Sequence, residues 1–501
     1  MTVKSRLQLA WNYAQLGILV FPLIPILGAL GIFLGLVITG KQHYRQIIRQ
    51  PINQGLGILS ILLIIVSCFA RDRLAAFLGL LGNFLPFFIF FAAFSNLIQT
   101  TVQLRRLSWL LVITSVPVVI LGLGQQFFGW VTPIQLQGIF GWVLEFKGNP
   151  PGRMSSVFMY ANILASYLTI VLILGLGLWF DVDVEGRRKK EEGRRKREEG
   201  RRKKEEGRGK KEEGRGKREE ENINSESSTP ITNYQLPISN YQSPITNYQL
   251  PFLSIAVIGD AVALILTNSR NAWGLAVLAS LAFSLYLGWR SLVAIVASLS
   301  GVILCSSFGP EPVKNWLRGI VPYFIWGRLT DQMYQNRPVA TLRKTQWEFA
   351  WNMTWQRPWT GWGMRNFTPL YEAQMHRWLG HPHNLFLMLT AETGIPVTIF
   401  FCGLVGWVLA QGVWLLINWR EKNYRDYLTG VSELDSQISS HRDRLIFFSY
   451  LVAFAACTLF NTVDVTLFDL RVNTIGWLLL AAICGVVNYR SNMESNLIPI
   501  L

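Results

Sequence analysis

Long apolar segments recur along the whole chain, and this feature constrains the fold more than any other. A helix needs about 20 apolar residues to cross the hydrocarbon core of a bilayer. Ten segments are close to this length, and they cover about residues 54–70, 74–97, 107–129, 156–180, 251–268, 272–289, 291–309, 395–418, 444–463 and 473–488. The sequence therefore predicts an all-α, polytopic integral membrane protein.

A further apolar segment, about 10–39, carries Pro22 and Pro25 near its middle. It is long for one span, so it forms either one tilted helix or a hairpin of two short helices. Short loops rich in Lys and Arg stay on the cytoplasmic side, which places the basic loops 41–50 and 103–106 inside. The basic N-terminus joins them only if 10–39 is a hairpin. The result is about twelve transmembrane helices with both termini cytoplasmic, and eleven is the alternative.

The net charge of +16 is spread unevenly along the chain. Residues 185–221 alone hold 18 Lys or Arg and 12 Glu, and the other 464 residues are only about 10% charged. A soluble domain has about 25% charged residues. Outside this segment, the composition is therefore that of a membrane protein.

The charged segment is built from repeats. Residues 185–219 are five heptads such as EGRRKKE, and residues 231–251 are three heptads of the type ITNYQLP. No position of the charged heptads is apolar, so a coiled coil would have no seam to bury. Such runs are typically solvated and disordered, and contact with anionic lipid or nucleic acid is the alternative. We predict a disordered, low-complexity cytoplasmic insert over 181–250, which activity does not need.

The segment 310–394 is the one long loop on the predicted outer side. Between residues 310 and 383, nine Lys or Arg oppose four acids, and a charge of +5 suits an anionic partner. The residues 341–358 predict a helix that ends before Pro358, with Trp347, Trp351 and Trp355 on one face. Trp at a membrane surface is usually an anchor, and a platform for sugar rings is the alternative. Arg343 lies one turn before Trp347, which directs it toward a protein cavity.

Two of the five histidines, His381 and His383, flank a proline just before a span. Histidine titrates near neutral pH, which suits a general base or a proton shuttle. Neither an acid nor a Cys stands near them in the sequence, so we predict no metal site. The five cysteines also lack the spacing of a zinc site or a disulfide framework.

Two further arginines, Arg153 and Arg270, reach the outer edge of the membrane in this orientation. An ionisable residue beside a span is a functional candidate, although Arg270 can also cap a turn at the interface. We expect Arg153, Arg270, Arg343 and His383 to converge on one outer cavity. Guanidinium groups match phosphate oxygens and keep their charge, so this cavity suits a diphosphate.

These residues resemble the O-antigen ligase and O-antigen polymerase superfamily of bacterial envelope glycan assembly. The likeness rests on an Arg after Ser269, an Arg four residues before Trp347, and a His-Asn pair followed after nine residues by Gly394. Val397 departs from the Gly, Thr or Tyr that the pattern expects there. The remaining matching residues are Arg357, Pro358, Trp359, Gly361, Gly363, Asn366 and Phe367.

The resemblance implies a glycosyltransferase of the inner membrane that uses an undecaprenyl-diphosphate-linked glycan on the periplasmic face. The implied reaction is inverting and independent of metals and cofactors, and the acceptor is a sugar such as lipid A core or a growing polysaccharide. His383 would act as base, and Arg270 and Arg343 would stabilise the leaving diphosphate. The candidate substrate-binding residues are Arg153, Asn384, Arg357, Trp347, Trp351 and His381. Arg328 and Arg337 are alternatives to Arg343.

A rival interpretation is an anion transporter, because relatives described as inorganic-carbon transporters share several of these features. A transporter should have broken helices and a substrate site near mid-membrane, where Asp260 is the deep acidic candidate. A third interpretation is a scaffold of envelope synthesis. The predicted layout is N-terminal helices over 1–180, the insert 181–250, central helices 251–309, a periplasmic catalytic loop 310–394 and C-terminal helices 395–501.

Overall fold

The structure is a computed structural model that describes residues 3–216, 246–330, 332–334, 338–419 and 433–497. These residues form helices, and no strand occurs among them. The all-α, polytopic class is thus confirmed. The chain divides into two compact units, one made of Met1–Leu178 with Ile255–Leu501 and the other of Trp179–Ser254.

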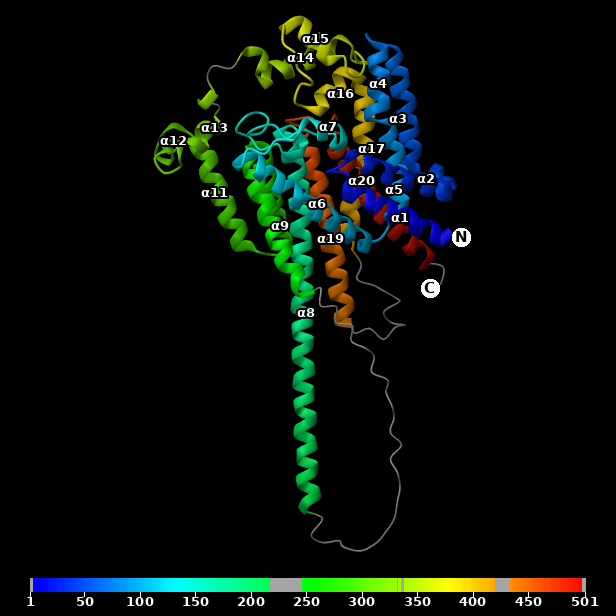
Figure 1. Ribbon diagram of the computed structural model, residues 1–501, viewed down its shortest axis with the longest axis vertical. Coiled ribbons are helices and arrows are strands. Elements are labelled where there is room, and N and C mark those ends of the chain that lie inside the picture. Colours follow the sequence, from blue (N-terminus) through cyan, green and yellow to red (C-terminus); the bar gives the residue numbers. More distant parts are fainter. Residues whose placement is uncertain (1–2, 217–245, 331, 335–337, 420–432, 498–501) are drawn as a thin grey trace. The chain divides into compact units, whose positions relative to one another are not determined.

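The helices follow one another along the chain as Figure 1 shows. In order they are α1 (Val3–Val20), α2 (Pro25–Arg49), α3 (Pro51–Cys68), α4 (Arg73–Asn83), α5 (Leu85–Leu97), α6 (Thr101–Phe127), α7 (Ile134–Phe140), η1 (Ser156–Phe158), α8 (Ala161–Gly216), α9 (Thr246–Leu266), α10 (Arg270–Tyr286), α11 (Arg290–Phe308), α12 (Glu311–Arg318), α13 (Tyr323–Leu329), η2 (Gln332–Tyr334), η3 (Val339–Thr341), α14 (Arg343–Gln356), α15 (Phe367–Met375), α16 (Leu385–Thr393), α17 (Ile395–Ile417), α19 (Glu433–Phe460) and α20 (Leu470–Leu497).

Ten helical segments of the described residues are long and apolar enough to cross a membrane, with α4 and α5 counted as one. The predicted twelve spans include two more helices, α1 and α10. The helix α10 has only 17 residues, and α1 carries Lys4 and Arg6 among its first residues. The figure of twelve spans therefore stays a prediction.

The N-terminal apolar segment forms two helices, as the hairpin alternative predicted. The break lies between α1 and α2, and Pro25 occupies the first turn of α2, where a missing N–H costs no hydrogen bond. The two helices pack backbone against backbone. A Cβ on Gly17 would lie 2.6 Å from the nitrogen of Ile32 and 2.8 Å from the oxygen of Gly28. Only glycine permits this approach, which closes the hairpin.

The charged insert differs from the prediction of disorder, because α8 continues as a helix to Gly216. Glu, Lys and Arg have good helix propensity, and ion pairs four residues apart support the turn. Arg194 Nε lies 3.2 Å from Glu198 Oε1, and Arg187 Nη2 lies 2.9 Å from Asp183 Oδ2. The missing apolar seam excludes a coiled coil but not a single helix. The second repeat array lies largely outside the described residues.

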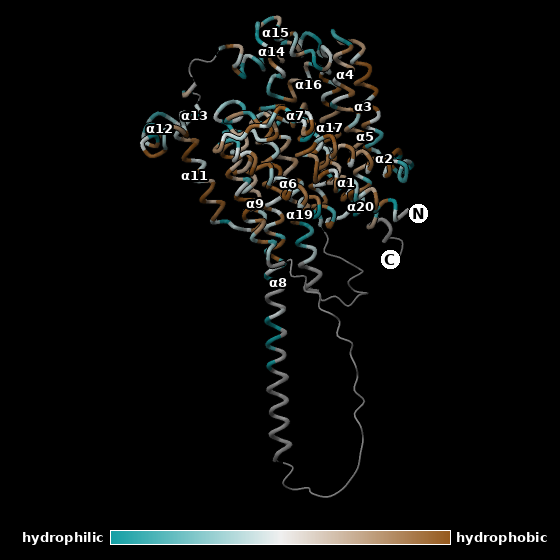
Figure 2. Tube along the Cα trace, viewed as in Figure 1, coloured by the Kyte–Doolittle hydropathy of each residue, from teal (hydrophilic) through white to brown (hydrophobic). Residues whose placement is uncertain are grey.

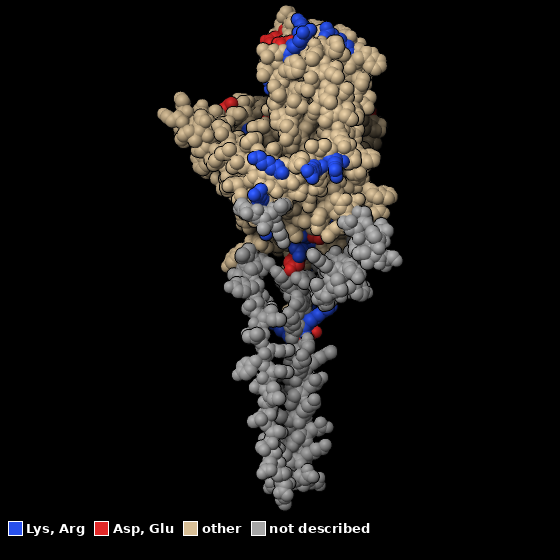
Figure 3. All heavy atoms as spheres, turned by 90° about the vertical axis from the view of Figure 1, so that its right-hand side faces the viewer, with Lys and Arg blue, Asp and Glu red and all other residues tan. Residues whose placement is uncertain are grey.

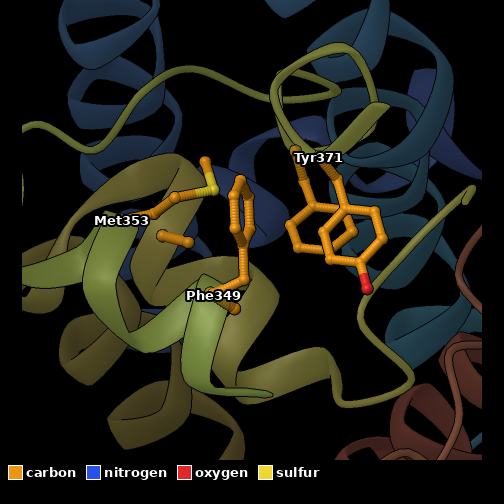
Figure 4. Packing of buried hydrophobic residues seen from close by; sticks show 6 residues of the cluster. Phe349, Met353 and Tyr371 are labelled. Carbon is orange, nitrogen blue, oxygen red and sulfur yellow. The ribbon is translucent and has the colours of Figure 1, made fainter. Parts of the chain in front are cut away.

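The outer segment holds short helices, as predicted, and they surround a small apolar core. The helix α14 turns Phe349, Ala350 and Met353 inward against Phe367 and Tyr371 of α15 (Figure 4). The Phe349 and Tyr371 rings meet edge to face with centroids 5.0 Å apart. This core fixes α14, and with it Arg343, relative to α16.

The surface of the larger unit matches a membrane environment. Most of its helices are hydrophobic, as the brown colour in Figure 2 shows. On the face shown in Figure 3, two groups of Lys and Arg are separated by a broad band that carries almost no charge. The helices α14–α16 lie at one end of this unit, and the start of α1 and the end of α20 lie toward the other (Figure 1).

Candidate active site

The centre of the candidate site is a pair formed by His383 and Asp464. Nδ1 of His383 lies 3.0 Å from Oδ1 of Asp464. The aspartate is in the connection between α19 and α20, and its side chain is only 3% exposed. A carboxylate only accepts hydrogen bonds, so Nδ1 of His383 carries the proton and Nε2 is the acceptor nitrogen. This is the arrangement that a histidine base needs.

Local structure sets the position of His383. It has a φ of +52°, a left-handed conformation that is uncommon for residues other than glycine. The helix α16 begins two residues later, and the side chain of Asn384 caps it by accepting a hydrogen bond of 3.0 Å from the nitrogen of Leu387. The nitrogen of Leu385 donates to the carbonyl of Asn461 over 2.9 Å, which joins α16 to the end of α19.

A chain of hydrogen bonds holds the second carboxylate oxygen of Asp464, the one that does not contact His383. Asn162, at the start of α8, donates to Oδ2 of Asp464 over 2.5 Å. Arg153 in turn donates from Nη2 to the side-chain oxygen of Asn162 over 2.5 Å, and from Nε to the carbonyl of Thr267 over 2.8 Å. Arg153 therefore lies two hydrogen bonds from the aspartate, beside the segment that leads to α10.

The charge of Asp464 is maintained despite its burial. Burial raises the pKa of this carboxyl group. The hydrogen bond and charge of His383, together with His381 and the nitrogen of Val465, lower the pKa by more than burial raises it. The net result is a pKa below the usual range. Asp464 therefore stays a carboxylate and can stabilise a positive charge on His383.

His381 stands beside the pair and is neutral. Burial, with help from His383, lowers the pKa of its imidazole to about 4. Its Nδ1 accepts a hydrogen bond of 3.2 Å from the nitrogen of His383, and its Nε2 lies 3.9 Å from Oδ1 of Asp464. The ligand atoms of His381, His383 and Asp464 lie within 4.8 Å of one another, so they could hold a metal ion. With Nδ1 accepting, however, the proton sits on Nε2, and a metal there must first displace it.

Tyr160 lies near the pair, within reach of the charges of two arginines. Tyr160 lies close enough to Asp464, Arg153 and Arg343 to be influenced by their charges, and burial is the main reason that its pKa is raised. The charge of Arg343 also acts on His381. The structure thus brings His381 and Arg153 close to His383, and the charge of Arg343 reaches His381. The convergence of Arg153, Arg270, Arg343 and His383 on one outer cavity stays a prediction.

Arg270 lies at the start of α10, and its place in the outer cavity stays a prediction. It is the first residue of α10, and its Nη1 donates to the main-chain oxygen of Arg328 in α13. The next residue, Asn271, donates to the carbonyl of Phe460 at the end of α19 over 3.3 Å. The start of α10 therefore borders the site, while the hydrogen bond of Arg270 itself leads to the outer segment. Arg337, the other alternative, lies outside the described residues.

The remaining candidates have separate positions. Asn384 is occupied as a helix cap, as described above. Arg357 stacks on Trp362 at 4.1 Å and donates to the carbonyl of Phe69 at the end of α3, which is a structural contact. Trp351 is 48% exposed. Trp347 is partly buried, and its indole nitrogen has no hydrogen-bond partner among the described residues.

No local pattern in the sequence points to Asp464, Asn162 or Tyr160 as site residues. Asp464 follows His383 by 81 residues and Asn162 precedes Asp464 by 302, so no local motif links them. One feature of the sequence could have indicated Asp464. Asp464 comes directly after the apolar segment 444–463, on the side of the membrane where the predicted orientation places His383.

The loop 361–367 contacts α16 through hydrogen bonds to Glu392. This contact predicts that the stability of the fold depends on pH. Burial raises the pKa of Glu392 to about 7, although the nitrogen of Phe367 donates to it over 3.2 Å. An acid whose pKa is higher in the folded state stabilises the fold below its unfolded pKa, and this contribution is lost as the pH rises through 7. The loss amounts to about 3 kcal/mol at alkaline pH.

We expect the melting temperature of the detergent-solubilised protein to fall between pH 5 and pH 9, and Glu392→Gln to flatten this dependence. Gln keeps the carbonyl acceptor but has no charge to bury. Thermal unfolding curves of both proteins at several pH values provide the measurement. Equal slopes for the two proteins would contradict the assignment.

Comparison with known families is consistent with this site. Residues 255–402 match the family model described as O-Antigen ligase. The matching segment begins in α9 and ends in α17, and it includes Arg270, Arg343 and His383 but not Arg153 or Asp464. No curated protein matches the chain. Residues 255–402 are thus similar to the O-antigen ligase family, as the sequence motifs predicted.

Proposed function

We propose that the protein transfers a glycan from undecaprenyl diphosphate to a sugar hydroxyl on the periplasmic face of the inner membrane. The observation that carries this proposal is the 3.0 Å contact between His383 and Asp464, with Arg153 and Arg343 nearby. A base oriented by a carboxylate beside two cations suits the attack of a hydroxyl on a diphosphate-linked sugar. The acceptor is a lipid A core or a growing polysaccharide.

The reaction is a single displacement. The acceptor oxygen attacks the anomeric carbon, and Nε2 of His383 takes the proton of the hydroxyl. The carboxylate of Asp464 stabilises the imidazolium that forms, and the bond from carbon to the diphosphate oxygen breaks. Arg343 and Arg153 stabilise the negative charge that grows on the diphosphate. One displacement inverts the anomeric configuration, and no step uses a metal ion.

The choice among the arginines follows from their contacts. The charge of Arg343 acts on both Tyr160 and His381, which supports a position near the pair. Arg328 instead stacks on Trp273 at 5.8 Å. We therefore assign the second cation to Arg343, and give Arg270 the role of a neighbouring cation at the rim.

The rival transporter interpretation has weaker support. Asp260 is buried in α9, where Oδ2 accepts a hydrogen bond of 3.1 Å from Ser115 of α6. The helix α9 runs without a break past Asp260, whereas transporters build such sites from interrupted helices. The arrangement of α1 and α20 at the end away from α14–α16 supports cytoplasmic termini (Figure 1).

The test is reconstitution of the full chain in vesicles. With an undecaprenyl-diphosphate-linked glycan and an acceptor glycolipid, we expect transfer of the glycan and release of undecaprenyl diphosphate in the presence of a chelator. Parallel vesicles are loaded for uptake of labelled bicarbonate. Uptake without transfer would replace the proposal by the transporter interpretation.

The insert offers a further prediction, because no candidate site residue lies within it. Deletion of residues 185–247 is expected to leave the rate of glycan transfer unchanged. The measurement is transfer per molecule of protein recovered in the membrane fraction. A deletion variant that reaches the membrane but has lost transfer would show that the insert takes part in activity.

A further inference from the structure

A cavity of about 230 Å³ lies beside the candidate site, within the larger unit. Its walls come from α16, α17, α19 and α20, and they are mostly apolar. Leu385, Asn461, Thr466 and Asn473 line its outer end, and Leu409 and Leu480 line it further along α17 and α20.

The outer rim of this cavity is formed by residues that lie close in sequence to His383 and Asp464. Leu385 follows His383 by two residues, and its nitrogen is bound to the carbonyl of Asn461 over 2.9 Å. Thr466 follows Asp464 by two residues, and its nitrogen donates to the side-chain oxygen of Asn461 over 3.0 Å. A molecule in the cavity therefore ends next to the pair.

One polar group in the wall lacks a partner. Asn473 is in the first turn of α20 and is only 8% exposed. Its Nδ2 is buried and has no hydrogen-bond partner among the described residues. A buried amide donor without a partner costs free energy, so this position calls for an acceptor oxygen supplied by a ligand.

We propose that the cavity holds the first isoprenoid units of the lipid-linked donor, with the amide of Asn473 donating to the phosphate oxygen next to them. The inference rests on the proposed function. The cavity is smaller than sites that enclose a whole ligand, so it suits part of a long chain. Its apolar walls match the chain, and its polar rim faces the end where the diphosphate must lie to meet His383.

Filling the cavity tests the inference. A Cβ on Gly476 of α20 would lie 3.6 Å from Sγ of Cys457, and both residues line the cavity. Gly476→Leu therefore occupies this space. In vesicles, we expect the variant to raise the KM for the undecaprenyl-linked donor about ten-fold, with little change in kcat, because apolar contact with the chain is lost.

The matched control is Gly403→Leu in α17. A Cβ there meets nothing within 4 Å, and Gly403 does not line the cavity. This variant adds the same side chain to a membrane helix, so it should keep the KM of the unmodified protein. An equal KM for the two variants would overturn the inference. Asn473→Leu is expected to weaken donor binding about ten-fold as well.

A binding measurement keeps the inference testable if Gly476→Leu does not fold. Undecaprenyl diphosphate with a photoreactive group in its first isoprenoid units is bound to the full chain in vesicles and irradiated. We expect labelling of peptides that contain Leu409 or Leu480, and competition by unlabelled undecaprenyl diphosphate. Labelling of the same peptides by a phospholipid with a photoreactive acyl chain, and displacement by phospholipid, would overturn the inference.

The two proposals fail in different ways. Labelling of the cavity without any glycan transfer would refute the proposed function and leave a binding site for the lipid diphosphate. Transfer with no labelling of the cavity would refute the inference and leave the function intact.

Discussion

Replacement of His383 by alanine is expected to lower the rate of glycan transfer by about 10²–10⁴, the usual contribution of a positioned general base. The reason is that Nδ1 of His383 is engaged by Asp464, so Nε2 is the nitrogen available to take the proton of the acceptor hydroxyl. The measurement is the initial rate of transfer in vesicles at saturating donor. The KM for the donor should change little, because the imidazole acts on the acceptor.

The left-handed backbone of His383 requires a second variant. Alanine is strained at a φ of +52°, whereas asparagine adopts this conformation more readily. His383→Asn should therefore keep the local backbone and still lose transfer. If His383→Asn retained most of the rate and only His383→Ala lost it, the residue would shape the loop and would not be a base.

A histidine outside the pair serves as the control. His376 ends α15, is exposed and also has a φ of +52°. His376→Asn is thus the same substitution in the same backbone conformation, in the same outer segment. It is expected to leave the rate of transfer unchanged, which separates loss of a reactive imidazole from general damage to the outer segment.

The fold was largely predictable from the apolar segments, because burial in a bilayer imposes a simple rule of length and composition. The prolines near residue 22 also indicated the hairpin of α1 and α2 as one of two alternatives. The charged heptads differ from the prediction of disorder. Their lack of apolar residues favours disorder, but ion pairs such as Arg194 and Glu198 support a helix without an apolar seam.

The site was predictable only where its residues share a local pattern. His383 and Arg343 belong to one outer segment, and the resemblance identified both. The pattern also selected Asn384, whose position before a helix is explained by capping. It could not reveal that the fold brings Asn162 and Asp464 to His383, because this depends on how α8 and α19 pack and on no spacing in the sequence.

Asp464 provides the second large effect that we expect. Asp464→Asn keeps the shape of the side chain but removes the charge that stabilises an imidazolium at His383. In serine hydrolases with a comparable aspartate, the same substitution lowers kcat by about 10⁴. We expect a fall of about 10²–10⁴ in the rate of transfer, with the KM for the donor nearly unchanged, because the carboxylate acts through His383.

A structural role for Asp464 would also lower activity, since its Oδ2 holds Asn162 and, through it, Arg153. The double variant separates the two roles. If Asp464 acts through His383, then Asp464→Asn costs little more once His383 is already asparagine, because groups that act as a unit are strongly non-additive. If it acts by holding the helices together, the two losses multiply. Multiplied losses would show that the aspartate is a structural residue and that His383 works without it. A fall in the melting temperature of Asp464→Asn large enough to account for its loss of activity would show the same.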